Sequence, residues 1–168
     1  MVHGTYHKYS LGEPAITCII GTGSNSCYFD GNEVSEVVPA LAYILGDEGS
    51  ASYIGKRLVS DFLYKKLPQE MAEDFFNTYQ LDKDEIITSV YNKPNANVYL
   101  ASFSRFAGKH IHTAYVQDII REGFSKFADI HIACFENCRE VPVHFVGSVG
   151  AIFQDILLEV LEERGMKL

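Results

Sequence analysis

The turn GTGSNS, residues 21–26, combines glycines with hydroxyl side chains directly after the apolar run 15–20. A phosphate that approaches the main chain needs converging N–H donors and no β-carbon in its way. Glycine provides that access and the unusual dihedral angles. Thr22, Ser24 and Ser26 could add uncharged donors, and Asn25 could both donate to and accept from a sugar or ribose hydroxyl. The turn is therefore a candidate phosphate site, and a tight hairpin that merely needs glycines is the alternative.

The spacing of this turn does not match two familiar nucleotide motifs. The dinucleotide-binding fingerprint requires glycine at the position of Ser26, and the P-loop requires Gly-Lys followed by Ser or Thr, which the chain lacks. A second glycine turn, GSVG at residues 147–150, joins the apolar run 141–146 to an amphipathic segment. The amides at the start of that helix could bind a phosphate, or its small residues could let an adenine ring lie flat. An ordinary strand-to-helix turn is the alternative.

An acidic turn, LGDEGS at residues 45–50, places Asp47 and Glu48 between two glycines at the start of a predicted helix. Adjacent carboxylates at this position either cap the helix or bind a polyol. A carboxylate that accepts hydrogen bonds from sugar hydroxyls is the sharper of the two hypotheses. Both remain open from the residues alone.

The cysteines and histidines could form a metal site, but their pattern favours other roles. The chain has no secretory signal and four cysteines, so reduced and buried thiols are expected at Cys18, Cys27, Cys134 and Cys138. His131 precedes Cys134 and Cys138 at a spacing that could align three ligands on a helix. Zinc sites usually have a second, separated ligand pair, which is not evident here. His110 and His112 are expected at a solvated helix end, and no metal ligand is predicted.

The composition indicates one globular domain with small polar ligands. The chain has 168 residues, of which 47% are hydrophobic, and at this size about 68–70% of the unfolded surface can be buried. Its net charge of −8 argues against nucleic acid and anionic membranes as partners. No apolar run approaches the ~20 residues of a membrane span, and residues 1–10 lack the regions of a signal peptide. A cytoplasmic protein is expected, and a homodimer is compatible with the sequence.

The elements that must position these turns follow from hydrophobic periodicity. Strands are predicted over 15–21, 24–30 and 33–38 as an antiparallel meander, with a further strand over 141–146. Helical spacing predicts helices over residues 50–66, 69–79, 82–91, 98–111, 113–135 and 151–164. This order is typical of an α/β domain, and it shows no repeat or linker.

Three segments together carry a family resemblance: IIGTGSNSC, LGDEGSASYIGKRLVSDFL and PVHFVGSVGAIFQDIL. In this order the chain, from about Glu13 onward, resembles the BadF/BadG/BcrA/BcrD-type ATPase family in its N-acetylglucosamine kinase-like form. This family is part of the actin, hexokinase and heat-shock-chaperone superfamily. The resemblance implies an α/β, ribonuclease H-like (actin-like ATPase) domain, whose mixed sheet starts with the antiparallel meander and has helices on both faces.

The resemblance also implies the ligands of each turn. ATP phosphates would be bound by Gly21, Thr22, Gly23 and Ser24, and the sugar by Thr22, Asn25 and Asp47. Adenosine would lie against Gly147, Ser148, Val149 and Gly150. The implied cofactors are ATP and Mg²⁺, and the implied partner is a small sugar, N-acetylglucosamine or a related one.

The chain departs from the family pattern at its beginning. The family has a first phosphate loop, an Asp-Gly-Gly-rich hairpin, far upstream of the matching turn, whereas twenty residues precede Gly21 here. The family's catalytic base is an aspartate before the first strand, whereas the first aspartate here is Asp30. We therefore expect residues 1–168 to form a single domain, the second of two, with the first ATPase domain absent. No catalytic residue is assigned, and this chain alone should be inactive.

The expected function of the intact protein is transfer of the ATP γ-phosphate to a hexosamine hydroxyl, most of all that of N-acetylglucosamine. The segment VPALAY, residues 38–43, replaces the Gly-Trp-Gly of many such sugar kinases, so the exact sugar stays open. Two alternatives remain. One is an activator ATPase for a CoA-ester reductase or dehydratase, and the other is a non-catalytic nucleotide- or sugar-binding module. The acidic turn favours a sugar.

Overall fold

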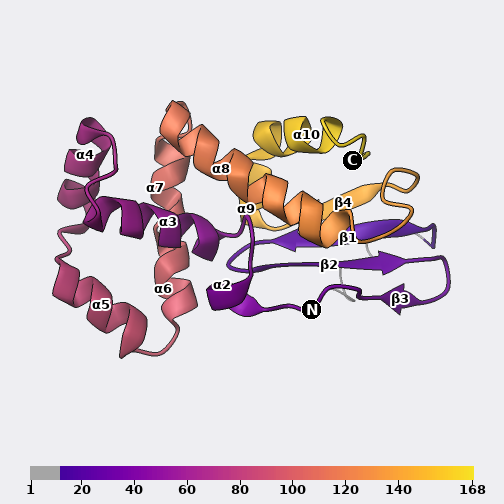
Figure 1. The fold of residues 1–168 in the computed structure, drawn as a ribbon, viewed down its shortest axis with the longest axis horizontal. Coiled ribbons are helices and arrows are strands. Elements are labelled where there is room, and N and C mark those ends of the chain that lie inside the picture. The colour runs from indigo at the N-terminus through magenta and orange to yellow at the C-terminus, as the bar shows by residue number, and fades with distance from the viewer. Residues whose placement is uncertain (1–11) are drawn as a thin grey trace.

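The computed structural model describes residues 12–168, so the segment 1–10 considered for a signal peptide lies outside its described part. A four-stranded mixed sheet organises the chain (Figure 1). Its order is β3-β2-β1-β4, in which β1 pairs antiparallel with β2 and parallel with β4. The strands are β1 (Ala15–Ile20), β2 (Ser24–Phe29), β3 (Val34–Ser35) and β4 (Val143–Val146). The predicted mixed α/β sheet, its meander and the position of the last strand are confirmed, although β3 is shorter than expected.

The parallel pair places two turns at one edge of the sheet. β1 is almost entirely buried, which explains its run of apolar residues, and its register pairs Ile19 with Val146. Both strands end within one residue of this pair. Because parallel strands end on the same side, the chain leaves β1 and β4 toward neighbouring positions. The two glycine turns of the sequence follow directly from these ends.

Helices fill the rest of the described chain. In chain order they are α2 (Ala42–Leu45), α3 (Ala51–Leu63), α4 (Gln69–Tyr79), α5 (Lys83–Tyr91), α6 (Ala96–Ser102), α7 (Ser104–Lys109), α8 (Ala114–Phe127), the π-helix η1 (Ala128–Ile132), α9 (Ser148–Ile152) and α10 (Gln154–Glu162). Figure 1 shows α8 and α10 over the sheet, with α3 to α7 extending away from it. In the described residues, ring contacts join this layer to one face of the sheet, at Tyr28 and Phe145.

Three predicted helices are interrupted, so their continuous ranges were wrong. The range 98–111 is divided at Phe103, and 113–135 passes into the π-helix after α8. The range 151–164 starts earlier, at Ser148, and breaks at Phe153. Phe103 is 1% exposed and Phe153 2% exposed, so both breaks occur where a large side chain enters the core. Tertiary packing therefore overrides the local periodicity at these points.

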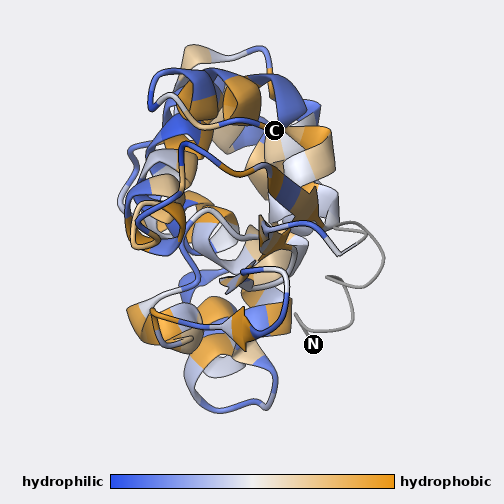
Figure 2. Cartoon of the chain, turned by 90° about the vertical axis from the view of Figure 1, so that its right-hand side faces the viewer, coloured by the Kyte–Doolittle hydropathy of each residue, from blue (hydrophilic) through white to orange (hydrophobic). Residues whose placement is uncertain are grey.

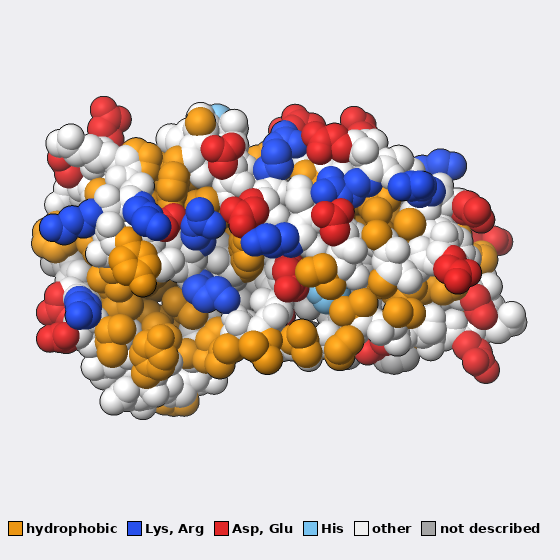
Figure 3. Space-filling view, viewed as in Figure 1, with side chains coloured by type: hydrophobic (Ala, Val, Ile, Leu, Met, Phe, Trp, Pro, Cys, Tyr) orange, Lys and Arg blue, Asp and Glu red, His pale blue; other side chains and the backbone are white. Residues whose placement is uncertain are grey.

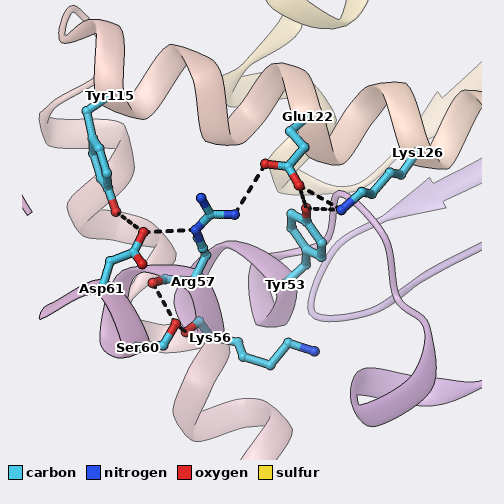
Figure 4. Close-up of polar contacts among 8 residues, drawn as sticks. All are labelled: Tyr53, Lys56, Arg57, Ser60, Asp61, Tyr115, Glu122 and Lys126. Atoms are coloured by element: carbon cyan, nitrogen blue, oxygen red, sulfur yellow. Dashed lines mark hydrogen bonds and ion pairs between the residues drawn. The ribbon is translucent and has the colours of Figure 1, made fainter. Parts of the chain in front are cut away.

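A polar network joins α3 to α8 across the helical layer (Figure 4). The carboxylate of Asp61 accepts a hydrogen bond from Arg57 Nε at 2.8 Å and one from the Tyr115 hydroxyl at 2.7 Å. Glu122 on α8 pairs with Arg57 at 3.2 Å and with Lys126 at 2.7 Å. Burial by itself would raise the pKa of Asp61, but the hydrogen bonds from Tyr115 and Arg57 and the Arg57 charge hold that pKa below its usual value.

Helices α3 and α6 are in close contact at Gly55. A β-carbon on this residue would lie 1.8 Å from the Leu100 carbonyl oxygen, which is impossible without a shift of the backbone. The close approach requires glycine, although a helix interior normally disfavours it. This contact fixes the distance between the two helices.

The surface carries a mixture of side chains and one apolar groove. Hydrophobic and hydrophilic stretches alternate along both strands and helices (Figure 2). A groove of about 680 Å³ lies between α2, α3 and α5, with Tyr43, Ile87 and Tyr91 in its lining. Figure 3 shows apolar side chains gathered in this part of the molecule. Within residues 12–168, no helix has the length and apolar character that crossing a bilayer requires.

Candidate functional site

The structure brings the two glycine turns into contact. Gly147, which follows β4, has a φ of +126°, and a β-carbon there would lie 2.1 Å from the Ile20 carbonyl oxygen and 3.2 Å from the Gly21 amide nitrogen. Only glycine combines this dihedral angle with such a close approach. Turns that are 126 positions apart in the sequence thus share one edge of the sheet, at the carboxyl ends of β1 and β4.

The first turn is a tight hairpin that also supports a helix. The Gly21 amide donates to the Gly23 carbonyl oxygen at 2.9 Å and closes the connection between β1 and β2. At the start of α3, the Ala51 amide donates to the Gly21 carbonyl oxygen at 2.8 Å. The Ser52 amide donates to the Thr22 carbonyl oxygen at 3.1 Å. The carbonyl oxygens of Gly21, Thr22 and Gly23 therefore all accept hydrogen bonds, and the bonds from α3 stabilise the conformation of the turn.

The hydrogen-bond donors that remain free in this turn differ from those expected. Ser24 Oγ donates to the Glu48 carbonyl oxygen at 2.8 Å and Ser26 Oγ to the His131 carbonyl oxygen at 2.6 Å, so these hydroxyl protons are already engaged. Thr22 is exposed. Within the described chain, the amides of Thr22 and Gly23 have no hydrogen-bond acceptor. A β-carbon on Gly21 would meet nothing within 4 Å. Backbone amides, open space and one hydroxyl suit a phosphate.

The carboxylate of Asp47 lies directly over this turn. Its Oδ1 atom accepts a hydrogen bond from the Ser24 amide at 3.1 Å. A β-carbon on Gly23 would lie 2.8 Å from the same oxygen and 2.9 Å from Oδ2. Asp47 has a φ of +58°, a left-handed conformation that non-glycine residues adopt rarely and that aspartate tolerates better than most. Oδ2 has no described hydrogen-bond partner within residues 12–168 and remains available as an acceptor.

The capping alternative for this carboxylate is wrong. The residue that caps α3 is Ser50, whose side chain accepts a hydrogen bond from the Tyr53 amide at 3.2 Å. Asp47 contributes only its backbone oxygen, which accepts from the Ser50 amide at 3.1 Å. Sequence reasoning could not distinguish the two because serine and aspartate cap helices about equally well.

Asn25 lies on the opposite face of β2 from Ser24 and Ser26. Strand alternation directs Ser24 and Ser26 toward Glu48 and the π-helix, so Asn25 points to the opposite face. Its Oδ1 atom is buried and has no hydrogen-bond partner in the part of the chain described. A buried polar atom without a partner costs free energy, so this position would gain from a ligand that donates to it. The structure describes no contact between Asn25 and Asp47.

The second turn contributes less than the four residues expected. Ser148, Val149 and Gly150 belong to α9, and only Gly147 precedes it. Val149 is 2% exposed and packs in the core, whereas Ser148 is exposed. A β-carbon on Gly150 would make only ordinary contacts, the nearest at 3.7 Å. The solvent-accessible part of this turn is therefore Gly147 together with Ser148.

The cysteines and histidines form no metal site in residues 12–168. Cys18, Cys27 and Cys138 are buried, as predicted, whereas Cys134 is only partly buried, so the prediction was wrong for that thiol. Burial raises the pKa of the Cys27 thiol to about 11. His110 lies at the end of α7 and His112 is exposed, as expected, but His110 has a partner, because its Nε2 atom lies 2.7 Å from Asp74 Oδ2. His131 is 3% exposed and faces Glu48, a pairing across 83 positions for which the sequence has no signal.

Comparison with solved structures identifies the family. The structure of a protein described as a "putative N-acetylglucosamine kinase" from Porphyromonas gingivalis matches 98% of the chain, with a TM-score of 0.93 and 36% sequence identity. The chain belongs to the kinase-like ATPase family. Its mixed α/β sheet with helices has the actin-like ATPase fold of these kinase neighbours, and the resemblance inferred from the three sequence segments is confirmed.

A second solved structure shares the fold of this kinase-like ATPase. It is a "putative N-acetylglucosamine kinase" from Chromobacterium violaceum, which matches 97% of the chain with a TM-score of 0.74 and 18% identity. The chain spans 58% of the length of the Porphyromonas protein and 55% of the length of the Chromobacterium protein. No protein-family model matches the chain, and neither does any curated protein.

Proposed function

We propose that this kinase-like ATPase chain holds the phosphates of ATP and the sugar in a kinase that phosphorylates N-acetylglucosamine or a related hexosamine. One observation carries the proposal: the Gly21 turn, the Gly147 turn and Asp47 converge at the carboxyl ends of β1 and β4. In α/β sheets, ligands bind outside the carboxyl ends of strands. The names of the two structural neighbours support the choice of sugar.

The first turn would bind ATP through its backbone. The free amides of Thr22 and Gly23 and the exposed Thr22 hydroxyl are donors that fit phosphate oxygens, and the open space at Gly21 fits a close approach. ATP, when bound, supplies the γ-phosphoryl group that is transferred. Gly147 and Ser148 would lie against the adenosine. Phosphoryl transfer depends mainly on positioning and charge stabilisation, which such fixed amides can provide.

The sugar would be bound by Asp47, Asn25 and Thr22. Oδ2 of Asp47 can accept hydrogen bonds from sugar hydroxyls while Oδ1 keeps its bond to the Ser24 amide. Charge-assisted hydrogen bonds of this kind are stronger than neutral ones and orient the hydroxyl that receives the phosphate. The unpaired oxygen of Asn25 offers a further acceptor.

Mg²⁺ and the proton acceptor are not assigned to residues of this chain. The described residues contain no cluster of three metal-binding side chains, and no aspartate precedes Asp30 in the sequence. We propose that residues 1–168 form one ribonuclease H-like domain of the kinase, corresponding to the second domain of the family.

The test is a kinase assay on the full-length protein that contains this chain, with ATP, Mg²⁺ and a panel of sugars. We expect ADP formation that depends on N-acetylglucosamine or another hexosamine and exceeds the rate with glucose. The Asp47→Asn variant serves as the matched comparison. It should lower the rate of ADP formation at a subsaturating sugar concentration. ADP formation that no sugar stimulates, together with no calorimetric sugar binding, would refute the proposed function.

A further inference from the structure

A closed ring of hydrogen bonds ties the acidic turn to the π-helix. Ser24 Oγ donates to the Glu48 carbonyl oxygen at 2.8 Å, and Ser26 Oγ donates to the His131 carbonyl oxygen at 2.6 Å. The ring closes between the side chains of Glu48 and His131, whose Oε2 and Nε2 atoms lie 3.2 Å apart. Ser24 and Ser26 are alternate residues of β2 and therefore face the same side. One strand thus anchors both partners of the side-chain pair.

The Glu48–His131 pair joins a buried histidine to a partly buried glutamate. The side chain of His131 is 4% exposed and that of Glu48 is 17% exposed. The imidazole stacks on Phe127, with centroids 4.9 Å apart and planes 22° apart, and its Nδ1 atom has no hydrogen-bond partner in the described residues. Glu48 is therefore the polar partner that the structure gives this ring. Loss of Glu48 would leave the buried His131 ring without this polar partner.

The Glu48–His131 pair lies next to Asp47, the residue proposed to bind the sugar. Glu48 directly follows Asp47, whose carboxylate accepts from the Ser24 amide at 3.1 Å. On the other side, Gly49 has a φ of +70° and packs on α8, where its β-carbon would lie 3.1 Å from the Gly123 carbonyl oxygen. The acidic turn is held by β2 at Asp47, by α8 at Gly49, and by the π-helix at Glu48.

The π-helix is the element that brings His131 to this turn. It widens the end of α8, with the Ala133 amide donating to the Ala128 carbonyl oxygen at 2.9 Å. Single π-turns of this kind are frequent at functional sites. Here the π-helix contains His131, whose Nε2 atom faces Glu48.

We propose that Glu48 and His131 are positioning residues that hold the Asp47 carboxylate in the orientation needed for the sugar. The sugar part of this proposal rests on the proposed function. In this proposal the pair acts through Asp47 and does not bind the sugar directly. It fixes the backbone on the far side of Asp47, so that the left-handed conformation of Asp47 and its bond to the Ser24 amide persist. Residues in one hydrogen-bond network are coupled, which allows the effect of His131 to reach Asp47.

The first measurement needs no ligand. Hydrogen exchange of the Ser24 amide, followed by NMR, reports its bond to Asp47. We expect exchange to accelerate about tenfold in His131→Phe, which keeps the aromatic stack but removes the donor. Glu48→Gln keeps an acceptor oxygen and should preserve the wild-type rate. Tyr115→Phe, which removes a hydrogen bond to Asp61 away from the site, is the control for general destabilisation. An unchanged Ser24 rate in His131→Phe would refute the proposal.

A double variant separates positioning from packing. Glu48→Leu with His131→Phe removes both polar partners, so its melting temperature should recover relative to His131→Phe alone. Ser24 exchange should nevertheless stay fast, and in the full-length protein the dissociation constant for N-acetylglucosamine should rise about tenfold while that for ATP stays within twofold. Recovery of slow exchange and sugar affinity together with stability would show that the pair only packs. If Ser24 exchange behaves as expected but even the wild type binds no sugar, the proposed function fails and the positioning of Asp47 stands.

Discussion

The Asp47 carboxylate lies so close over Gly23 that a β-carbon on the glycine would be 2.8 Å from Oδ1. Gly23 has an ordinary dihedral angle, so the chain can accept alanine there if the carboxylate moves. We therefore expect Gly23→Ala to displace Asp47 and to weaken sugar binding by the full-length protein about tenfold. This change corresponds to the loss of one hydrogen bond to a charged group. Calorimetric titration with N-acetylglucosamine measures this. An unchanged sugar affinity would mean that Asp47 does not contact the sugar.

Asp47→Asn tests whether the negative charge of Asp47 contributes to sugar binding, without disturbing the turn. Asparagine tolerates the left-handed conformation and keeps an oxygen for the Ser24 amide, so the melting temperature should stay unchanged. It replaces the second acceptor oxygen with a donor, so sugar affinity should fall about ten- to a hundredfold. ATP affinity should stay within twofold. Sugar binding that survives this change would rule out the ligand role of Asp47.

Gly21→Ala tests the nucleotide side of the turn. The added β-carbon meets no atom within 4 Å, so folding and sugar binding should remain those of the wild type. If phosphate oxygens approach the backbone here, the methyl group will obstruct them, and ATP affinity should fall at least about tenfold, the equivalent of one hydrogen bond to a charged group. Fluorescence titration with a labelled ATP analogue measures the change. Gly23→Ala and Gly21→Ala thus affect different ligands, and an identical effect of both would contradict the assignment.

Two helical glycines make a matched test of packing. Gly55→Ala forces a β-carbon to 1.8 Å from the Leu100 oxygen, so it should lower the free energy of unfolding by at least about 3 kcal/mol. Gly108→Ala on α7 meets its nearest atom at 3.8 Å, and the better helix propensity of alanine should raise stability by up to about 1 kcal/mol. Urea titrations compare the two. Equal midpoints would mean that α3 and α6 are less closely packed than described.

The stability contributed by Asp61 should disappear in acid. Because its pKa is lower in the folded protein than its usual value of 3.8, this contribution is complete above about pH 4 and is lost as the pH falls through the folded pKa. At pH 7, Asp61→Asn should reduce the free energy of unfolding by about 1.5–3 kcal/mol, the value of hydrogen bonds to a charged group. The difference from the wild type should shrink below pH 4.

The exposed carboxylate of Asp118, which no described hydrogen bond engages, provides the control for that measurement. Asp118→Asn should leave the free energy of unfolding at pH 7 as in the wild type. A difference between Asp61→Asn and the wild type that persists at low pH would instead indicate a packing effect of the substitution.

Local patterns predicted the elements, and contacts between distant segments determined the site. Alternation and apolar runs located β1, β2 and β4, and glycine chemistry located both turns. The breaks at Phe103 and Phe153 carry no glycine or proline, so only the packing of these rings reveals them. The cap at Ser50 and the pairing of Glu48 with His131 depend on three-dimensional distances that residue types do not encode.

The docking of α3 also has a mechanical meaning. Its first two amides are bonded to the carbonyls of Gly21 and Thr22, and its middle is locked against α6 at Gly55. Because α3 is bonded to the turn at one end and packed against α6 at its centre, a displacement of α6 would strain the hydrogen bonds at Gly21 and Thr22. The helical layer is therefore coupled to the hairpin between β1 and β2 through α3 as well as through its contacts with the sheet.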